Sequence, residues 1–519
     1  PLALSQAAHI HQGNPSIAKV PKVTGSIKST IVPSVIADEM TEAFGPALTR
    51  PAVLCRTKGQ DPMELARLKA FTPNVNPDAA LLNECAHHYM NKVLVNVKNS
   101  DCRFLSYAEA IQGVEGDEYL TGVKRSSSAG YGWTGTKANY LGKDGEYVLD
   151  HPEVLRKYET MRARVQQGRR SGTVWIDTLK DERRTHEKVE ACKTRLFSAG
   201  ELAYLILFRQ YFAGFAAHMS RNKVKVESCV GVNPYSQDWN MIGMALMSKG
   251  EHVVAGDFSN YDGTLSAAVL WSCLDVIESF YQEGRDWREN DRTTRRALWM
   301  DIVNSVHVSG DFLYMWNHSQ PSGCPITAVL NSVYHSIVAR YVYVRCAEKY
   351  APEQSSLAVF DRKVVHVNYG DDDVYNIASD IVDWYNQVTM SEAFVELGMV
   401  YTDETKTGEL VKSRKLCDVA FLKRKFRWDA SQARFRAPLS LDTVTEMSRW
   451  VKGPKNHWDL TAQTLSEALM ELAEHDEETF IAIREKMVPS IRKLQKRNMI
   501  VDDGTYAAFQ RQAYIRYCM

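Results

Sequence analysis

The sequence predicts an α+β protein of two to four lobes, with strands in the middle of the chain and helices at its end. The chain has 519 residues, which is more than one ordinary hydrophobic core accommodates. Strand-like stretches fall between residues 173 and 378. Beyond Trp428 the apolar pattern is mainly helical, with Leu465, Leu469 and Leu472 on one helix face.

The first segment is rich in proline, because nine of the seventeen prolines fall between Pro1 and Pro77. Proline removes a backbone donor and fixes φ, so we expect an extended arm draped over the rest of the protein, with one helical patch near residues 35–44. The ten cysteines are scattered singly, without a C-x-x-C pair. This spacing is typical of free thiols in a reducing compartment. No apolar run reaches membrane-spanning length.

The central elements follow in order along the chain. Residues 152–168 are helical and basic, and residues 173–180 read as a strand. Residues 251–262 form a buried strand that ends in a loop, and residues 264–281 an amphipathic helix. Residues 363–378 have β-rich sequence on both sides of a glycine, which indicates a hairpin.

Two of these strands carry carboxylates, which are costly to bury unpaired. The first delivers Asp257, with Asp262 five positions on, and the hairpin tip delivers Asp371 and Asp372. If the strands are neighbours, Asp257 and Asp371 meet. Converging hard oxygen ligands suit Mg²⁺, and two such ions can stabilise an in-line phosphoryl transfer. Taken alone, the Gly-Asp run is more typical of a solvated turn.

Two further stretches have a second interpretation if a metal site lies beside them. Residues 322–331, "SGCPITAVLN", place small residues before an apolar helix; a capped core helix is the plain alternative. Residues 180–195 form the core of a basic run, since residues 156–195 contain twelve Lys or Arg against six Asp or Glu. That stretch is either a solvated charged hairpin or a clamp for a triphosphate.

Taken together and in this order, the motifs resemble those of picornavirus-like viral RNA-dependent RNA polymerases, most of all the dicistrovirus enzymes of insects. The resemblance covers residues 126–456. Motifs A and C match Asp257, Asp262 and Tyr369 to Asp372, and motif B matches Ser322, Gly323, Thr327 and Asn331. Motif D matches Lys406, motif E residues 421–424, motif F the basic run and motif G residues 127–133.

The resemblance implies a closed right hand of fingers, palm and thumb, whose palm is an antiparallel sheet flanked by helices and whose fingers close onto the thumb. Residues 1–211 would form the N-terminal arm and fingers, 212–265 and 311–429 the palm, 266–310 a fingers insertion, and 430–519 the thumb. We expect the proline-rich arm to lie across the fingers and to reach the thumb.

The resemblance also implies roles for single residues. Asp257, Asp371 and Asp372 would bind two Mg²⁺ ions, for which Mn²⁺ can substitute, and Lys406 would donate a proton to the leaving pyrophosphate. The residues expected to bind the nucleotide are Lys180, Arg184, Lys188, Arg195, Asp262, Ser322, Thr327 and Asn331. Those expected to bind RNA are Ser127, Ser128, Gly130, Tyr131, Phe421, Leu422, Lys423 and Arg424.

The implied partners are template and product RNA, ribonucleoside triphosphates, a small genome-linked protein primer and other viral replication proteins. The implied location is the host cytoplasm, in replication complexes that reach membranes through partners. Two rival functions stay open: a reverse transcriptase, and a decayed polymerase fold that only binds RNA. Asp262 and Asn331 argue against the first, since they offer a 2′-hydroxyl partners. The complete set of metal ligands argues against the second.

Overall fold

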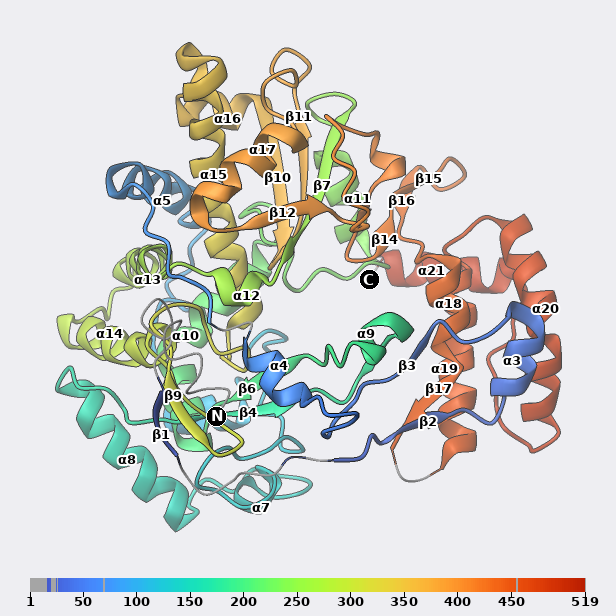
Figure 1. Cartoon of the computed structure of the whole chain (residues 1–519), viewed down its shortest axis with the longest axis horizontal. Helices are drawn as coiled ribbons and strands as arrows, with labels where there is room; N and C mark the ends of the chain where they lie inside the picture. The colour runs from blue at the N-terminus through green and yellow to red at the C-terminus, as the bar shows by residue number, and fades with distance from the viewer. Residues whose placement is uncertain (1–15, 20–24, 26, 69–70, 454–455, 519) are drawn as a thin grey trace.

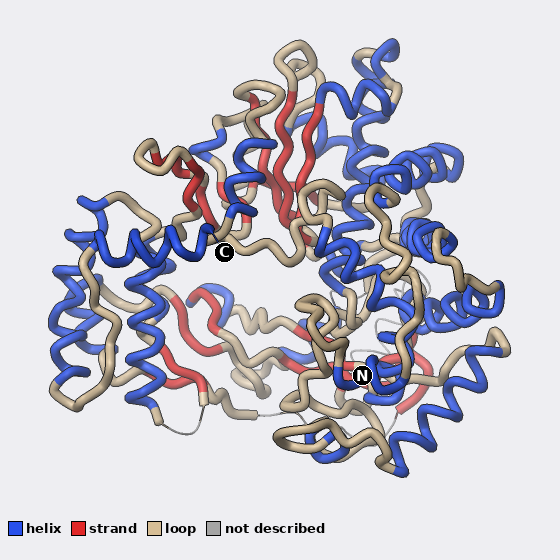
Figure 2. Tube along the Cα trace, turned by 180° about the vertical axis from the view of Figure 1, so that it is seen from behind, coloured by secondary structure: helices blue, strands red, loops and turns tan. Residues whose placement is uncertain are grey.

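The computed structural model describes residues 16–19, 25, 27–68, 71–453 and 456–518. A four-stranded sheet occupies the top of Figure 1, a five-stranded sheet the lower left, and the C-terminal helices the right. Figure 2 shows the same three regions from behind, with helices beside both larger sheets. The mixture of strands in the middle and helices at the end is the one that the sequence predicts.

The four-stranded sheet has the order β10-β11-β7-β12, and all its neighbours are antiparallel. Its strands are β7 (His252–Ser259), β10 (Val364–Tyr369), β11 (Asp372–Ile377) and β12 (Val400–Asp403). The predicted strand and hairpin are therefore confirmed. Of the two strands of the hairpin, β11 is the one that pairs with β7, so β7 lies inside the sheet between β11 and β12. Helices α15 (Thr327–Tyr350) and α17 (Gln387–Phe394) pack against this sheet.

The five-stranded sheet has the order β1-β9-β8-β4-β6 and gathers strands from distant parts of the chain. These are β1 (Ser16–Lys19), β4 (Trp175–Leu179), β6 (Leu196–Ala199), β8 (Val306–Ser309) and β9 (Phe312–Met315). The expected domain boundary at 310/311 passes through the turn between β8 and β9, and their pairing keeps residues 312–315 in this sheet. The boundary at 429/430 likewise separates two paired strands, β15 (Arg427–Asp429) and β16 (Arg434–Arg436).

Helices cover the five-stranded sheet and join it to the first. They are α5 (Ala79–Val93), α6 (Tyr107–Gln112), α7 (Ala138–Leu141), α8 (Pro152–Gln166), α10 (Leu202–Arg221), α13 (Ala267–Gln282) and α14 (Glu289–Val303). One hydrophobic cluster runs through these helices and α15 as far as Tyr401. Helix α10 is buried over most of its surface, and the expected boundary at 211/212 falls inside it. None of the helices that the structure describes is long and apolar enough to span a membrane.

The C-terminal helices enclose a second hydrophobic cluster, to which the arm contributes. They are α18 (Leu441–Met447), α19 (His457–Leu472), α20 (Glu477–Gln495) and α21 (Tyr506–Cys518). The predicted stripe of Leu465, Leu469 and Leu472 is fully buried there, together with Ile36 and Met40 of the arm. Both arm residues come from the predicted helical patch, where α3 (Ala37–Phe44) packs on α20.

The arm crosses the molecule by strand pairing, as expected from its prolines. Strand β2 (Ile31–Pro33) pairs with β17 (Trp450–Lys452) beside the C-terminal helices. Strand β3 (Thr49–Pro51) pairs with β5 (Arg183–Thr185) of the basic run, and β1 pairs with β9. In Figure 1 the blue arm runs along the bottom of the molecule toward the red helices. The arm thus connects the basic run with the C-terminal helices. The expectation that it lies across the first and reaches the second is confirmed.

The remaining described elements are short. They are α4 (Pro62–Leu68), α9 (His186–Glu190), α11 (Gln237–Ala245), α12 (Tyr261–Thr264), α16 (Leu357–Lys363), β13 (Ala420–Phe421), β14 (Arg424–Lys425) and the 3-10 turns η1 (Pro352–Gln354), η2 (Val395–Leu397) and η3 (Leu416–Asp418).

Candidate active site

The predicted carboxylates meet at one end of the four-stranded sheet. Strand β11 pairs with β7 so that Asp373 lies opposite Gly256, one residue before Asp257. Asp371 lies in the two-residue turn between β10 and β11, which the pair Tyr369–Asp372 closes. Gly370 has a φ of 68° as the first residue of this turn, a conformation that favours glycine in tight hairpins. The strand pairing and the turn therefore bring Asp257, Asp371 and Asp372 together at this end of the sheet.

The acids repel one another there. Burial, followed by the charge of Asp257, raises the pKa of Asp371. Burial, followed by the charges of Asp371 and Asp257, raises the pKa of Asp372 to about 7. A set of carboxylate oxygens that disfavours its own ionisation fits a hard divalent cation, which stabilises the charged forms. The residues present therefore suit the metal that the sequence predicts.

Lys406 already contacts this group, since its Nζ lies 2.6 Å from Oδ2 of Asp257. The lysine follows β12 in a tight turn and has a φ of 60°. The carboxylate of Asp403 holds the turn, because it accepts hydrogen bonds from the backbone N–H groups of Thr407 at 3.1 Å and Gly408 at 2.9 Å. Lys406 is thus placed beside the acids by the strand that pairs with β7.

A cavity of about 310 Å³ opens between the acids and the basic run. Arg184, Lys188 and Arg195 line it from one side, and Asp371 and Lys406 from the other. Burial lowers the pKa of Lys188, and the charges of Arg184 and Lys406 lower it further. Cations crowded to this degree favour an anion between them.

Glu182 was not singled out from the sequence, yet it organises the basic run. Its carboxylate accepts a hydrogen bond from Nε of Arg195 at 2.6 Å. It also lies 3.7 Å from the cationic groups of both Lys180 and Arg184. Lys180 is half exposed and, unlike the other three predicted cations, does not line the cavity. In the sequence Glu182 is visible only as an acid two positions after Lys180, and the fold is needed to show which cations it contacts.

Asp262 and Asn331 come together as predicted from their motifs. Nδ2 of Asn331, on α15, donates a hydrogen bond to Oδ1 of Asp262, on α12, over 3.2 Å. Burial and then the charge of Asp371 raise the pKa of Asp262. Gln320, a second residue missed by the sequence analysis, donates to Oδ1 of Asn331. Asp262 also lines the cavity, so this pair borders the same space as the cations.

The small-residue loop before α15 lies against the protein's own backbone. A Cβ on Gly323 would lie 2.1 Å from the carbonyl oxygen of Ser198 in β6. The hydroxyl of Ser322 accepts a hydrogen bond from the N–H of Ser198 at 3.1 Å. Thr327 donates to the carbonyl oxygens of Ser322 and Cys324 at the start of α15. Gly323 is therefore required by packing, and Ser322 and Thr327 hold the loop in this state.

The residues of motif G form a glycine-rich loop beside α10. Nζ of Lys137 donates to the hydroxyl of Ser127 and to the carbonyl oxygen of Ser128. A Cβ on Gly130 would lie 2.5 Å from Cα of Glu201. Tyr131 is exposed, as a residue that stacks on RNA must be.

The four residues of motif E, predicted to bind RNA as one group, occupy different environments. Phe421 is buried and stacks on Trp239, with 6.3 Å between ring centroids. Arg424 forms an ion pair with Glu471 of α19 at 2.7 Å. Leu422 is partly buried, whereas Lys423 is exposed and lines a larger cavity of about 900 Å³ beside the C-terminal helices. Phe421 and Arg424, at the two ends of motif E, are thus engaged within the protein, because Phe421 is apolar and Arg424 pairs with a buried acid.

Comparisons with known proteins agree with this geometry. Residues 56–488 match the family model described as viral RNA-dependent RNA polymerase. The chain is 36% identical over 488 residues to the replicase polyprotein of Drosophila C virus, covering 89% of this chain and 27% of the relative. It is 35% identical over 512 residues to the replicase polyprotein of acute bee paralysis virus, covering 94% of this chain and 26% of the relative. The chain thus spans about a quarter of the length of these polyproteins.

A solved structure has the same fold. The Sicinivirus 3Dpol RNA-dependent RNA polymerase superposes with a TM-score of 0.79 at 20% sequence identity, covering 98% of this chain and all of the other. The predicted right-hand architecture is therefore confirmed, as is the predicted relationship to the dicistrovirus replicases. By sequence and by fold, the chain belongs to the family of viral RNA-dependent RNA polymerases, whose members use divalent metal ions.

Proposed function

We propose that this chain is the RNA-directed RNA polymerase that copies the genome of a positive-strand RNA virus. The observation that carries the proposal is the cavity between the acids and the basic run, where Asp371 faces Arg195 and Lys188. A triphosphate in this space would meet cations at its phosphates and metal ligands at its reacting phosphorus. The reaction joins the 3′-hydroxyl of a growing strand to the α-phosphorus and releases pyrophosphate.

Asp257 and Asp371 would hold two divalent ions, with Asp372 in support. Mg²⁺ fits the all-oxygen donor set, and Mn²⁺ can substitute. When bound, two such ions stabilise the attacking and leaving oxygens of an in-line displacement. Nζ of Lys406 lies 2.6 Å from Oδ2 of Asp257, so the lysine would move away from this acid when a cation takes its place. From its turn it can then face the leaving pyrophosphate and give it a proton.

The basic run would bind the triphosphate by exchange of partners. Arg195 leaves Glu182 and pairs with phosphate oxygens, to which its planar fork of donors is suited. Arg184 and Lys188 line the same cavity and add charge. Lys180, which lies outside the lining beside Glu182, would turn toward the triphosphate when it binds. Ser127, Ser128, Gly130 and Tyr131 would contact the template strand, and Lys423 the primer strand.

Asp262 and Asn331 would read the sugar. A 2′-hydroxyl can donate to Asp262 and accept from Asn331, which replaces their hydrogen bond to each other. Losing such partners in a closed site costs about 1–3 kcal/mol for each polar group. Asn331→Ala should therefore lower the ratio of kcat/KM for UTP over dUTP on a poly(A) template, mainly by slowing UTP. An unchanged ratio would assign the sugar reading to Asp262 and Thr327.

Primer extension on a homopolymeric RNA template tests the proposed function most simply. The protein should incorporate ribonucleotides onto an annealed RNA primer and require a divalent cation. Equal use of deoxynucleotides would indicate a reverse transcriptase, and template binding without incorporation a decayed fold. A second reaction with a tyrosine-bearing peptide in place of the primer tests whether synthesis starts on a small genome-linked protein.

The relatives are polyproteins, and other viral replication proteins are the proposed partners of this chain. We place the enzyme in the host cytoplasm, in replication complexes that reach membranes through those partners. Fractionation of cells that express the chain alone, or with the remainder of the replicase, tests this. Membrane association of the chain expressed alone would contradict the need for partners.

A further inference from the structure

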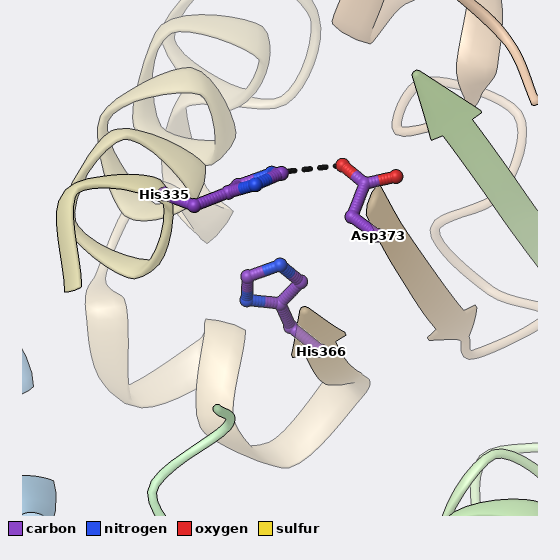
Figure 3. Close-up of side chains that lie close together, drawn as sticks. All are labelled: His335, His366 and Asp373. Carbon is purple, nitrogen blue, oxygen red and sulfur yellow. Dashed lines mark ion pairs between the residues drawn. The ribbon is translucent and has the colours of Figure 1, made fainter. Parts of the chain in front are cut away.

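A buried cluster of two histidines and an aspartate lies behind the turn that carries Asp371. His335 comes from α15, His366 from β10 and Asp373 from β11, and Figure 3 shows the three side chains facing one another. One ligand atom from each lies within 4.8 Å of the others. All three residues are at most 3% exposed. No step of the proposed polymerase reaction uses them.

The hydrogen bonds of His335 fix where its proton lies. Its Nδ1 lies 2.8 Å from the carbonyl oxygen of Gly370, which can only accept, so Nδ1 carries a hydrogen. Its Nε2 lies 2.8 Å from Oδ2 of Asp373. In a neutral imidazole this nitrogen presents a lone pair to a carboxylate oxygen, and the two repel. The contact therefore calls for a positive charge between these atoms.

His366 directs a second lone pair into the same space. Its Nδ1 lies 3.4 Å from Oε2 of Glu227. Burial would raise the pKa of Glu227, but the charges of Arg340 and Lys92 outweigh it and hold this pKa well below the usual range. The ionised carboxylate accepts a hydrogen from Nδ1, which leaves Nε2 of His366 as an acceptor. This nitrogen is buried without a hydrogen-bond partner and points toward His335 and Asp373.

A single proton cannot satisfy this arrangement. A hydrogen on Nε2 of His335 would pair it with Asp373, yet Nε2 of His366 would stay buried and unpartnered. Burial lowers the pKa of His366, so protonating it as well is unfavourable. One divalent cation would bind all three atoms at once.

The surroundings have the form that metal ligands have in proteins. Metal-binding histidines usually donate their second N–H to a carboxylate or a backbone carbonyl, and here both acceptor types occur. Oδ1 of Asp373 accepts hydrogen bonds from the N–H of Gly256 and the hydroxyl of Tyr401, each at 2.9 Å. These contacts leave Oδ2 free to point at the histidines.

We propose that His335 Nε2, His366 Nε2 and Asp373 Oδ2 bind one Zn²⁺ ion, with water in the fourth position. Two imidazoles and a carboxylate suit Zn²⁺, whereas Mg²⁺ prefers oxygen ligands alone. Ligands about 2.0 Å from a tetrahedral ion lie roughly 3.3 Å apart, so the 2.8 Å contact between His335 and Asp373 would open slightly.

Such an ion would fasten the turn that bears the catalytic acids. His335 holds the carbonyl oxygen of Gly370, and Asp373 follows Asp372 directly. The Zn²⁺ site is a support for this turn, distinct from the open site of Asp257 and Asp371. Its existence does not depend on the polymerase activity, so metal content can be tested without a turnover assay.

The first test measures zinc in the purified full chain by mass spectrometry after desalting. About one Zn²⁺ per chain is expected in the unaltered protein. Asp371→Asn should retain it, and His218→Gln, which removes a buried histidine elsewhere, should retain it too. Asp373→Asn should lose it, because the amide keeps the acceptor for Gly256 and Tyr401 but offers a poor ligand. His366→Asn should lose it as well. Zinc that persists in both variants would overturn the assignment.

Two measurements on the unaltered protein do not depend on how variants fold. After chelation and reloading with Co²⁺, visible absorption of a four-coordinate ion is expected; a protein that takes up neither Co²⁺ nor Zn²⁺ refutes the site. X-ray absorption of the Zn²⁺ form should show scattering from two imidazoles. A shell of oxygen ligands alone would mean an adventitious ion and would overturn the proposal.

Discussion

Two sets of acids in the same lobe meet opposite electrostatic surroundings. Glu227 meets Arg340 through two hydrogen bonds of 2.7 and 2.9 Å and Lys92 through one of 2.9 Å. Its pKa lies well below the usual range, because the neighbouring cations outweigh its burial. Asp371 and Asp372 lie at the turn that follows β10, and burial together with the charges of neighbouring acids raises their pKa values.

The difference separates structure from function. An acid that the protein pairs internally contributes to the stability of the fold, and breaking the pair exposes the cost of burying its charge. Acids whose negative charge the protein does not fully compensate reduce the stability of the fold and are suited to bind a cation from solution. Removing Glu227 should therefore damage the fold, whereas removing Asp371 should spare it and damage the chemistry.

The largest effect is expected from Asp371→Asn. The change removes a ligand oxygen of the proposed metal pair, which supplies several kcal/mol of transition-state stabilisation. Nucleotide incorporation should fall by roughly 1000-fold or more. Binding of template RNA, measured by fluorescence anisotropy, should be nearly unchanged. Incorporation at the unaltered rate with Mg²⁺ would remove Asp371 from the site.

Glu227→Ala should lower the free energy of unfolding by about 3–5 kcal/mol, because Arg340 is left buried without its partner. Denaturant titration measures this loss. The matched comparison is Asp371→Asn, which should be as stable as the unaltered protein or more so. If Glu227→Ala is no less stable than Asp371→Asn, the contrast between the two sets of acids is wrong.

Arg195→Ala should raise the apparent KM for nucleotides and lower the rate. The lost charge-assisted contact is worth about 1.5–3 kcal/mol. Affinity for RNA measured without nucleotide should scarcely change. Arg195→Lys restores the charge without the planar fork and should recover only part of the loss. A fall in RNA affinity with an unchanged KM would move Arg195 to the template path.

The smallest effect is a dependence of stability on pH. Asp372 has a pKa of about 7 in the folded chain without metal, against about 3.9 when unfolded. The unfolded chain ionises first, so this group costs stability as pH rises from about 4 to about 7. Bound cations favour the charged form and cancel the cost. The rise in Tm caused by Mg²⁺ with a triphosphate should thus be larger at about pH 8 than at about pH 6. An equal rise at both values would separate Asp372 from metal binding.

Residue patterns predict the elements that position the acids. The β-branched residues of β7, β10 and β11 alternate or run continuously, and Gly370 marks the turn between the last two. The helix after Thr264 and the leucine stripe of α19 are visible for the same reason. Strands of two or three residues, such as β13 and β17, are too short to leave a periodic pattern, and tertiary pairing alone defines them.

Contacts between distant segments could not be predicted. The engagement of Arg424 with Glu471 spans 47 residues, and nothing near either residue announces it. The hydrogen bond from Gln320 to Asn331 depends on the path of the loop before α15. The facing of His335 and Asp373 depends on how α15 packs on the hairpin. Sequence motifs predicted which residue types gather at the site, and packing decided which of them are occupied by internal partners.

Binding of Mn²⁺ to the chain, followed by electron paramagnetic resonance, tests most directly whether the acids at the end of the sheet await a cation. The unaltered protein should bind Mn²⁺ more tightly when a nucleoside triphosphate is present, because the phosphates supply further oxygen ligands. Asp257→Asn and Asp371→Asn should lose this binding, whereas Glu227→Gln and Asp373→Asn should keep it. Undiminished Mn²⁺ binding in Asp257→Asn and Asp371→Asn would contradict the account, since the ion would then lie elsewhere.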